Sequence, residues 1–234
     1  MAAKLAEITI PIQDKAIADH GVFHVAISGG SLAKTMAQGM LHNPKIQWEK
    51  WVIWLADERI VPLDHPDSNW GIFNSEVIEK LSPEQRPTSH TISTSLGYDT
   101  ASTAEFAAEY QHQLTESLGK VPVLDYIFLG AGPDAHTCSL FPGHQLLKEQ
   151  TLLVAGIDDS PKPPPRRITL TKKTLGLAEH MVFVCGGSGK QAALEGIFQT
   201  KDTSLPSYQV NELAKNPVVW LCDEDATASI KSLL

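Results

Sequence analysis

The sequence predicts a single α/β domain with a doubly wound, mostly parallel sheet and helices on both faces. Short apolar runs of strand length alternate with segments whose apolar residues recur at helical spacing. Most of these runs end directly in a loop rich in Gly or charged residues, as strands of a buried parallel sheet do. The chain has 234 residues, of which 42% are hydrophobic, and shows no linker or internal repeat. We therefore expect one domain over residues 1–234.

Seven segments are expected to form strands because they are short, apolar and bounded by Gly, Pro or charged residues. They cover residues 23–28, 51–55, 126–129, 151–155, 167–171, 181–185 and 217–222. Helices are expected at 32–41, 70–81, 103–118, 175–178, 191–198 and 223–234. Pro11 interrupts the weakly patterned residues 1–20, which predicts a short amphipathic helix or an extended lead-in. Residues 82–99 are rich in turn residues and are expected to form a surface loop.

The composition is typical of a soluble globular protein and argues against several functional classes. The net charge is -8, so nothing favours electrostatic binding to nucleic acid or to an anionic membrane. No apolar run approaches the length of a membrane span, and the N-terminus has no signal-peptide core. The three Cys residues are far apart and form no CxxC pair, which argues against a disulfide scaffold and a structural zinc site. We therefore expect a cytoplasmic protein that is a monomer.

The stretch 130–144, GAGPDAHTCSLFPGH, contains the first candidate for catalysis. It follows the apolar run 126–129, and its Gly- and Pro-rich start forces a turn. Asp134 then lies just before His136, and histidine is the side chain whose ordinary pKa is nearest neutrality. A carboxylate beside the imidazole can fix its tautomer and stabilise its cation. Taken alone, the segment is better explained as an ordinary turn with a solvated histidine.

Two Gly-rich turns are candidates for binding an anion. Residues 28–31, SGGS, connect an expected strand to an expected helix, and residues 186–190, GGSGK, do the same near the C-terminus. Such turns expose backbone N–H groups at a helix N-terminus, and glycine lets a ligand approach closely. Lys190 adds a positive charge to the second turn. The ordinary alternative is a plain strand-to-helix turn at both places, with Ser as a cap and Lys190 in solvent.

Three charged residues, Asp57, Glu58 and Arg59, come directly after a Trp-rich apolar strand. Charged side chains are costly inside a sheet, so they should lie at its edge, near a crevice. Arg59 can hold a phosphate or carboxylate through two parallel hydrogen bonds. An internal ion pair between Arg59 and a neighbouring carboxylate is the ordinary alternative. In the polar loop that follows, Ser68 or Asn69 is expected to cap a helix.

These polar loops are expected at one edge of the sheet, because the carboxyl ends of parallel strands meet there. Two Gly-rich helix starts, an arginine and a lysine make an anion pocket, and a histidine supplies a candidate base. The sequence has no cluster of carboxylates or thiolates that suggests a metal site. This combination favours a small phosphorylated substrate and proton-transfer or hydrolytic chemistry.

Six blocks of the sequence carry a family resemblance: ISGGS at 27–31, DERIVP at 57–62, DSNWG at 67–71, GPDAHTCSLFPGH at 132–144, DSPKPPPRRITLT at 159–171 and GGSGK at 186–190. In order and spacing they resemble the 6-phosphogluconolactonase family, especially its eukaryotic branch, from about residue 23 to the C-terminus. The resemblance implies a fold shared with glucosamine-6-phosphate isomerases. It also implies hydrolysis of 6-phosphogluconolactone to 6-phosphogluconate in the oxidative pentose phosphate pathway, without a metal or another cofactor.

The residues permit a specific mechanism as a hypothesis. Neutral His136 takes a proton from water as the water attacks the lactone carbonyl, and the imidazolium then protonates the departing ring oxygen. Asp134 or Asp57 orients the imidazole, and Arg59 stabilises the oxyanion or holds the phosphate. The alternative is a covalent mechanism in which Cys138 or Ser139 is the nucleophile. Substrate and phosphate binding is expected at Ser28, Gly29, Gly30, Ser31, Arg59, Asn69, Arg167 and Lys190.

The chain departs from the family pattern at Ala135, where members of the family usually have Gly. A positive φ at this position would cost Ala about 1 kcal/mol or more and would tilt His136. If the family Gly instead provides clearance, the Ala135 methyl would crowd the substrate. The lead-in before the first strand is also expected to be shorter than the helix found there in many family members.

Two other functions are open on the same fold. A sugar-phosphate isomerase or deaminase needs a carboxylate base over C2 of its substrate, and Asp57 and Glu58 are candidates. A non-catalytic sugar-phosphate sensor would bind 6-phosphogluconate and leave the lifetime of the lactone unchanged.

Overall fold

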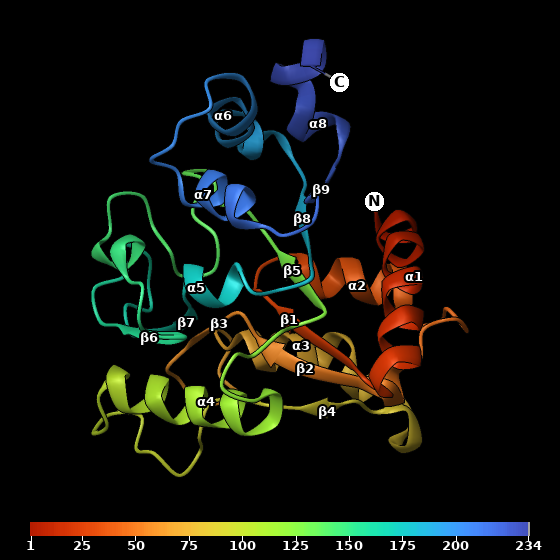
Figure 1. Cartoon of the computed structure of the whole chain (residues 1–234), viewed down its shortest axis with the longest axis vertical. Coiled ribbons are helices and arrows are strands. Elements are labelled where there is room, and N and C mark those ends of the chain that lie inside the picture. The colour runs from red at the N-terminus through yellow and green to blue at the C-terminus, as the bar shows by residue number, and fades with distance from the viewer. Residues whose placement is uncertain (234) are drawn as a thin grey trace.

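In the computed structural model, which describes residues 1–233, the main sheet has six parallel strands (Figure 1). Its strand order is β4-β2-β1-β5-β8-β9. The chain moves outward from β1 through β2 to β4, then returns to β5 on the other side of β1. The order therefore reverses between β1 and β5, and doubly wound sheets bind their ligands at such a point. The predicted fold class is confirmed. The strands are β1 (Phe23–Ile27), β2 (Trp51–Leu55), β4 (Thr88–Ser89), β5 (Tyr126–Leu129), β8 (His180–Cys185) and β9 (Val219–Cys222).

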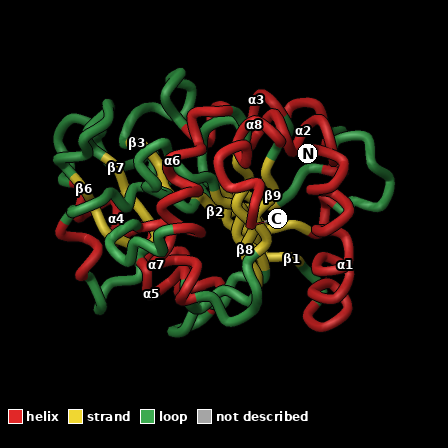
Figure 2. Tube along the Cα trace, turned by 90° about the horizontal axis from the view of Figure 1, so that it is seen from above, coloured by secondary structure: helices red, strands yellow, loops and turns green. Residues whose placement is uncertain are grey.

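A second, antiparallel sheet is not predicted by the apolar pattern of the sequence. It consists of β3 (Asp57–Arg59), β7 (Arg167–Leu170) and β6 (Val154–Ile157), in the order β3-β7-β6. Figure 2 shows this sheet on one side of the main sheet, with α1 (Ala2–His20) on the opposite side. The charged residues after β2 thus belong to a strand, and the register places Arg59 opposite Arg167.

The helices form layers around the main sheet. α1 packs against α2 (Leu32–Met40), which in turn packs against α3 (Asn69–Glu76). α4 (Thr103–Leu118) packs against β6 and β7. No helix within residues 1–233 is both long enough and apolar enough to cross a membrane. The remaining α-helices are α5 (Lys172–Leu175), α6 (Gln191–Leu194), α7 (Pro206–Leu213) and α8 (Glu224–Thr227).

The central strands form because their apolar residues are buried on both faces. Every residue of β2 and β5 is buried, as is nearly every residue of β1 and β8. Such continuous apolar runs are typical of parallel strands covered by helices. Local signals start and stop the helices: Ser102 and Glu105 form a capping box before α4, and Gly21 ends α1 with a φ of 88°.

The expected short lead-in is wrong, because α1 is a helix of 19 residues that contains Pro11. A proline inside a helix costs about 3 kcal/mol. Tertiary contacts offset this cost, because one face of the helix is buried. On that face, Gln13 accepts a hydrogen bond from Trp51 Nε1 at 2.8 Å and donates to the carbonyl of Lys45 at 3.0 Å.

Several other boundaries differ from the expected ones. Residues 82–99 contain the edge strand β4, and α7 lies in a segment for which no helix is predicted. β6 begins at residue 154 instead of 151, and α5 ends where the helix at 175–178 was expected to begin. α3 ends at Glu76, and the C-terminal helix changes to a 3₁₀ turn after Thr227. The expected last residue of that helix, Leu234, lies outside the described residues. Sequence patterns locate elements better than they locate element ends.

Candidate active site

A cleft of about 200 Å³ opens at the carboxyl edge of the main sheet, where β1, β2, β5 and β8 end. A larger cavity of about 530 Å³ lies at the opposite edge, near the starts of β1 and β8, and contains neither Gly-rich turn. All but one of the predicted site residues line the smaller cleft, and the remaining one, Asp134, contacts His136. Lining residues include Ser28, Gly29, Gly30, Ser31, Asp57, Arg59, Asn69, His136, Arg167 and Lys190.

His136 contacts two charged side chains. Asp134 Oδ1 lies 2.5 Å from His136 Nδ1, and Lys162 Nζ lies 3.0 Å from the same nitrogen and 3.1 Å from Asp134 Oδ1. A carboxylate and an imidazole nitrogen at 2.5 Å need a proton between them, which assigns the proton to Nδ1. Lys162 then donates to Asp134, and Nε2 of His136 is the basic nitrogen. The ring also packs on Phe141, with 4.9 Å between the ring centroids.

A tight turn brings Asp134 and His136 together. The N–H of Gly132 donates to the carbonyl of His136, and the N–H of Ala135 donates to the carbonyl of Gly132. The imidazole lies over Gly132, where a Cβ would come within 1.9 Å of Nδ1. Ala135 has a φ of 58°, so of the two alternatives for this position the positive φ is the one present. Its carbonyl accepts two hydrogen bonds from Ser207, which hold the turn in place.

The surroundings of His136 favour its neutral form. Burial lowers the pKa of His136, and the charge of Lys162 lowers it further, whereas Asp134 acts to raise it. The net effect is a pKa below the ordinary value of 6.5. Burial acts to raise the pKa of Asp134, but the hydrogen bonds and charges of His136 and Lys162 outweigh it and lower this pKa to about 2. At neutral pH the pair is therefore an ionised carboxylate beside a neutral imidazole.

Asp57 does not hydrogen-bond to the imidazole. Its two carboxylate oxygens accept from Ser28 Oγ at 3.0 Å and from Ser139 Oγ at 2.8 Å. Only 3% of Asp57 is exposed. Of the two carboxylates that were candidates to orient His136, Asp134 is therefore the one in contact. Ser139 serves as a hydrogen-bond donor to Asp57, which gives this hydroxyl a structural partner in place of the imidazole.

The first Gly-rich turn is shaped by Asn69. A Cβ on Gly29 would lie 2.0 Å from Asn69 Oδ1, so only glycine allows this approach. Asn69 Nδ2 donates to the carbonyl of Asp57 at 2.8 Å, while its Oδ1 is buried and has no partner among the described residues. Gly30 has a φ of 78° and leads into α2, whose cap residue Ser31 makes no side-chain capping bond. The N–H groups at the start of α2 are therefore not capped by that side chain.

The two arginines of the cleft differ in how their donors are used. Arg59 donates from Nη1 to the carbonyl of Asp67 at 2.9 Å, and its buried Nε has no partner within residues 1–233. Arg167 is 2% exposed and donates to the carbonyls of Lys162, Pro163 and Pro164. Arg59 thus retains unused hydrogen-bonding capacity, whereas Arg167 mainly holds the Pro-rich loop of residues 158–166.

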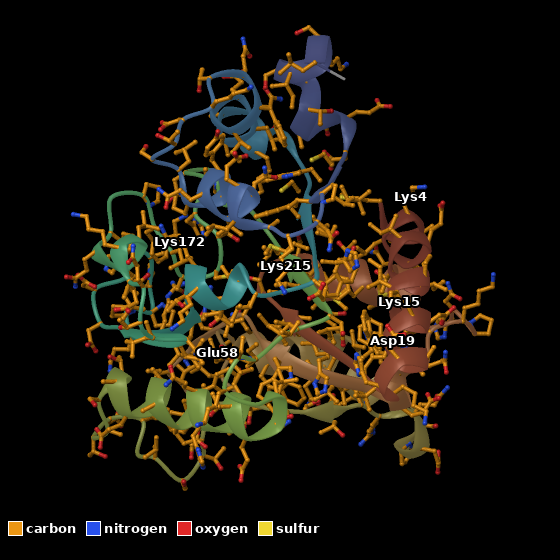
Figure 3. The ribbon with its side chains drawn as sticks, viewed as in Figure 1. Lys4, Lys15, Asp19, Glu58, Lys172 and Lys215 are labelled. Atoms are coloured by element: carbon orange, nitrogen blue, oxygen red, sulfur yellow. The ribbon has the colours of Figure 1, made fainter. Side chains whose placement is uncertain are left out.

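Glu58 is a structural residue at the start of α3. It is fully buried inside the molecule (Figure 3). Its carboxylate accepts from the backbone N–H groups of Arg59, Asn69 and Trp70 and from the hydroxyl of Ser68. The side chain of Ser68 also caps α3, as expected from the sequence. Glu58 therefore satisfies helix N-terminal donors and fixes Asn69 in the cleft.

Lys162 is the site residue that sequence reasoning missed. The loop that contains it has the composition of a rigid Pro-rich connection, and a single Lys there has no local pattern to mark it. The loop is held beside His136 by Arg167 and by the contact of His144 Nε2 with Asp159 Oδ1 at 2.9 Å. The DSPKPPPR block of the family resemblance was the only available signal, and it does not single out the lysine.

Known proteins resemble this chain in both sequence and structure. The model of the family described as glucosamine-6-phosphate isomerases/6-phosphogluconolactonase matches residues 1–220. The chain is 39% identical to 6-phosphogluconolactonase 3 of Saccharomyces cerevisiae over 237 residues, which is 98% of this chain and 93% of the yeast protein. It is 38% identical to 6-phosphogluconolactonase of Rattus norvegicus over 215 residues, 89% of this chain and 80% of that protein.

Solved structures show the same fold. The crystal structure of 6-phosphogluconolactonase from Thermotoga maritima has a TM-score of 0.77 and 26% identity, and the match covers 94% of both chains. The structure of the Trypanosoma brucei 6-phosphogluconolactonase has a TM-score of 0.81 at 22% identity, over 98% of this chain and 94% of that one. The chain belongs to the family of glucosamine-6-phosphate isomerases and 6-phosphogluconolactonases.

Proposed function

We propose that this enzyme hydrolyses 6-phospho-D-glucono-1,5-lactone to 6-phospho-D-gluconate in the oxidative pentose phosphate pathway, with His136 as general base and without a metal. The observation that carries the proposal is the Asp134–His136 pair, which lies in one cleft with the Gly-rich start of α2. The names of the yeast and rat relatives support the same reaction.

His136 supplies proton transfer in this proposal. Asp134 holds the Nδ1 proton, so Nε2 removes a proton from water as the water attacks the lactone carbonyl. Asp134 stabilises the imidazolium, which then protonates the departing ring oxygen. This proton transfer accounts for a rate factor of about 10²–10⁴. Burial and the charge of Lys162 lower the pKa of His136 and so keep the resting imidazole neutral.

The phosphate is bound by the opposite part of the cleft. The start of α2 presents backbone N–H groups, and Lys190 adds a charge from the second Gly-rich turn. Arg59 lines the same cleft, and its guanidinium charge completes the anion site. Gly30 leaves space for the phosphate oxygens, because a Cβ there would meet no protein atom within 4 Å.

The carboxylates argue against the isomerase alternative. An isomerase needs a carboxylate free to act as a base over C2. Glu58 is buried under the start of α3, and both oxygens of Asp57 accept hydrogen bonds from serine hydroxyls. Within residues 1–233, no three His, Cys, Asp or Glu side chains are grouped so that they can hold a metal ion.

The decisive experiment replaces His136 by Asn and measures hydrolysis of freshly generated lactone, corrected for its spontaneous hydrolysis. The rate should fall by about 10²–10⁴. His112→Asn, on the exposed surface of α4, is the matched control and should keep the wild-type rate. Wild-type turnover in His136→Asn would show that His136 is not the general base. A wild-type protein that binds 6-phosphogluconate without shortening the life of the lactone is a sensor, and ammonia release from glucosamine 6-phosphate would identify a deaminase.

A further inference from the structure

Cys185 and Cys222 are direct neighbours across two strands. They are the last residues of β8 and β9 and are register partners in the parallel sheet. Paired residues of adjacent parallel strands lie about 4.8 Å apart and point to the same face. That spacing falls within the range of about 4.4–6.8 Å over which two Cα atoms can be joined by a disulfide. Both residues are free thiols.

The two thiols interact with each other and with the cleft. Interaction with the Cys222 thiol acts to lower the pKa of Cys185, and interaction with Cys185 acts to raise the pKa of Cys222. The backbone of Ala131 and the charge of Lys190 also act to lower the pKa of Cys185, and both of these residues line the cleft. Cys185 is fully buried and Cys222 is half-buried, so small oxidants have access from the side of β9.

The ends of these strands control the second Gly-rich turn. Cys185 leads into Gly186 and Gly187, and Cys222 leads into Asp223. The Gly187 N–H donates to both carboxylate oxygens of Asp223, at 3.0 and 2.9 Å. The same carboxylate caps α8 through the N–H of Ala226. A change in the distance between the ends of β8 and β9 would therefore shift the second Gly-rich turn, which ends at Lys190.

We propose that Cys185 and Cys222 are a site of reversible oxidation by hydrogen peroxide, and that the resulting disulfide weakens substrate binding at the Lys190 turn. The two thiols lose two protons and two electrons, the S–S bond forms, and the peroxide is reduced to two molecules of water. β9 is an edge strand with an exposed Val219, so it can adjust to the cross-link. In a reducing compartment the pair is a dithiol, and the disulfide forms only under oxidative load.

The cross-link itself is tested without any activity assay. The reduced full-length protein is treated with hydrogen peroxide, remaining thiols are alkylated, and peptides are analysed by mass under non-reducing conditions. A linked peptide pair that contains Cys185 and Cys222, lost on treatment with dithiothreitol, is expected. Cys138→Ser should give the same linked pair, whereas Cys222→Ser should give none. Recovery of both thiols alkylated, or oxidised separately to sulfinic acids, would overturn the proposal.

The effect on substrate rests on the proposed lactonase function and is measured separately. The oxidised wild type should show a rise in KM for the lactone of about tenfold, the loss expected for one charge-assisted hydrogen bond, and reduction should restore it. Cys222→Ser and Cys222→Ala should keep their KM under the same peroxide treatment. Two results would refute the link between the disulfide and substrate binding. One is fully cross-linked enzyme with an unchanged KM, and the other is peroxide inhibition of the Cys222 variants as strong as that of the wild type. Absence of lactone hydrolysis by the reduced wild type instead refutes the lactonase function and leaves the mass result intact.

Discussion

Asp134 Oδ1 lies 2.5 Å from Nδ1 of His136, and the residue between them, Ala135, has a φ of 58°. Base and orienting carboxylate therefore come from the same turn, and no distant element is needed to align them. The third charged member, Lys162, comes from a separate loop and contacts both side chains. Asp134 and His136 are thus paired by the local sequence. Lys162 reaches them only in the tertiary structure, and its charge lowers the pKa of His136.

Replacing Asp134 by Asn should reduce kcat/KM by about 10²–10⁴, because an amide does not reliably hold the proton on Nδ1. The substitution also removes the negative charge that acts to raise the pKa of His136. The acid limb of the pH profile of kcat/KM should therefore move to lower pH. Asp99→Asn, at an exposed position, is the control for the loss of one carboxylate. An acid limb that moves to higher pH would contradict the assignment.

Lys162→Met should shift the acid limb in the opposite direction. The charge of Lys162 lowers the pKa of His136, so its removal raises that pKa and leaves less neutral imidazole at a given pH. We expect a loss in kcat/KM that is largest on the acid side and shrinks as pH rises. The profile of Lys148→Met, another exposed lysine, should match that of the wild type. A pH-independent loss in Lys162→Met would show that the lysine acts on the substrate alone.

Gly29→Ala should disturb the anion turn through a clash with Asn69. The new Cβ would lie 2.0 Å from Asn69 Oδ1, and overpacking of this kind costs about 1–3 kcal/mol. KM for the lactone should rise as the turn shifts. A double-mutant cycle with Asn69→Ala isolates the cause, because Gly29→Ala should cost much less when the amide is absent. Additive effects of the two substitutions would rule out the clash.

Two substitutions of Ala135 should differ clearly in their effect on the free energy of unfolding. Ala135→Gly relieves the positive φ but removes a methyl that packs on Ala193 and Ile197. The two effects oppose each other, so the free energy of unfolding in urea should change by less than about 1 kcal/mol. Ala135→Val places a β-branched residue in the left-handed region and should destabilise the protein by more than about 2 kcal/mol. Equal stabilities of the two variants would show that the backbone relaxes.

Glu58→Gln should lower the free energy of unfolding by about 2–4 kcal/mol. The carboxylate accepts from three backbone N–H groups and one hydroxyl, and an amide can satisfy only some of these buried donors. Denaturant unfolding of Glu58→Gln and of Glu116→Gln, an exposed residue of α4, provides the comparison. If both variants unfold at the wild-type denaturant concentration, Glu58 does not hold the start of α3.

The sequence by itself determined the strand and helix alternation of the main sheet and the loops that line the cleft. Buried parallel strands need continuous apolar runs, and the carboxyl ends of such strands meet at one edge. The positions of Gly29, Arg59, His136 and Lys190 in one cleft follow from these two rules. The family resemblance in the motifs then supplied the expected substrate.

The tertiary structure alone decided the contacts between segments far apart in the chain. It brought Lys162 to His136, engaged Asp57 with Ser139, and placed Cys185 beside Cys222. It also kept α1 helical through Pro11, because buried contacts on one face outweigh the local cost. No local pattern encodes such pairings, since each depends on which strands become neighbours and in which register.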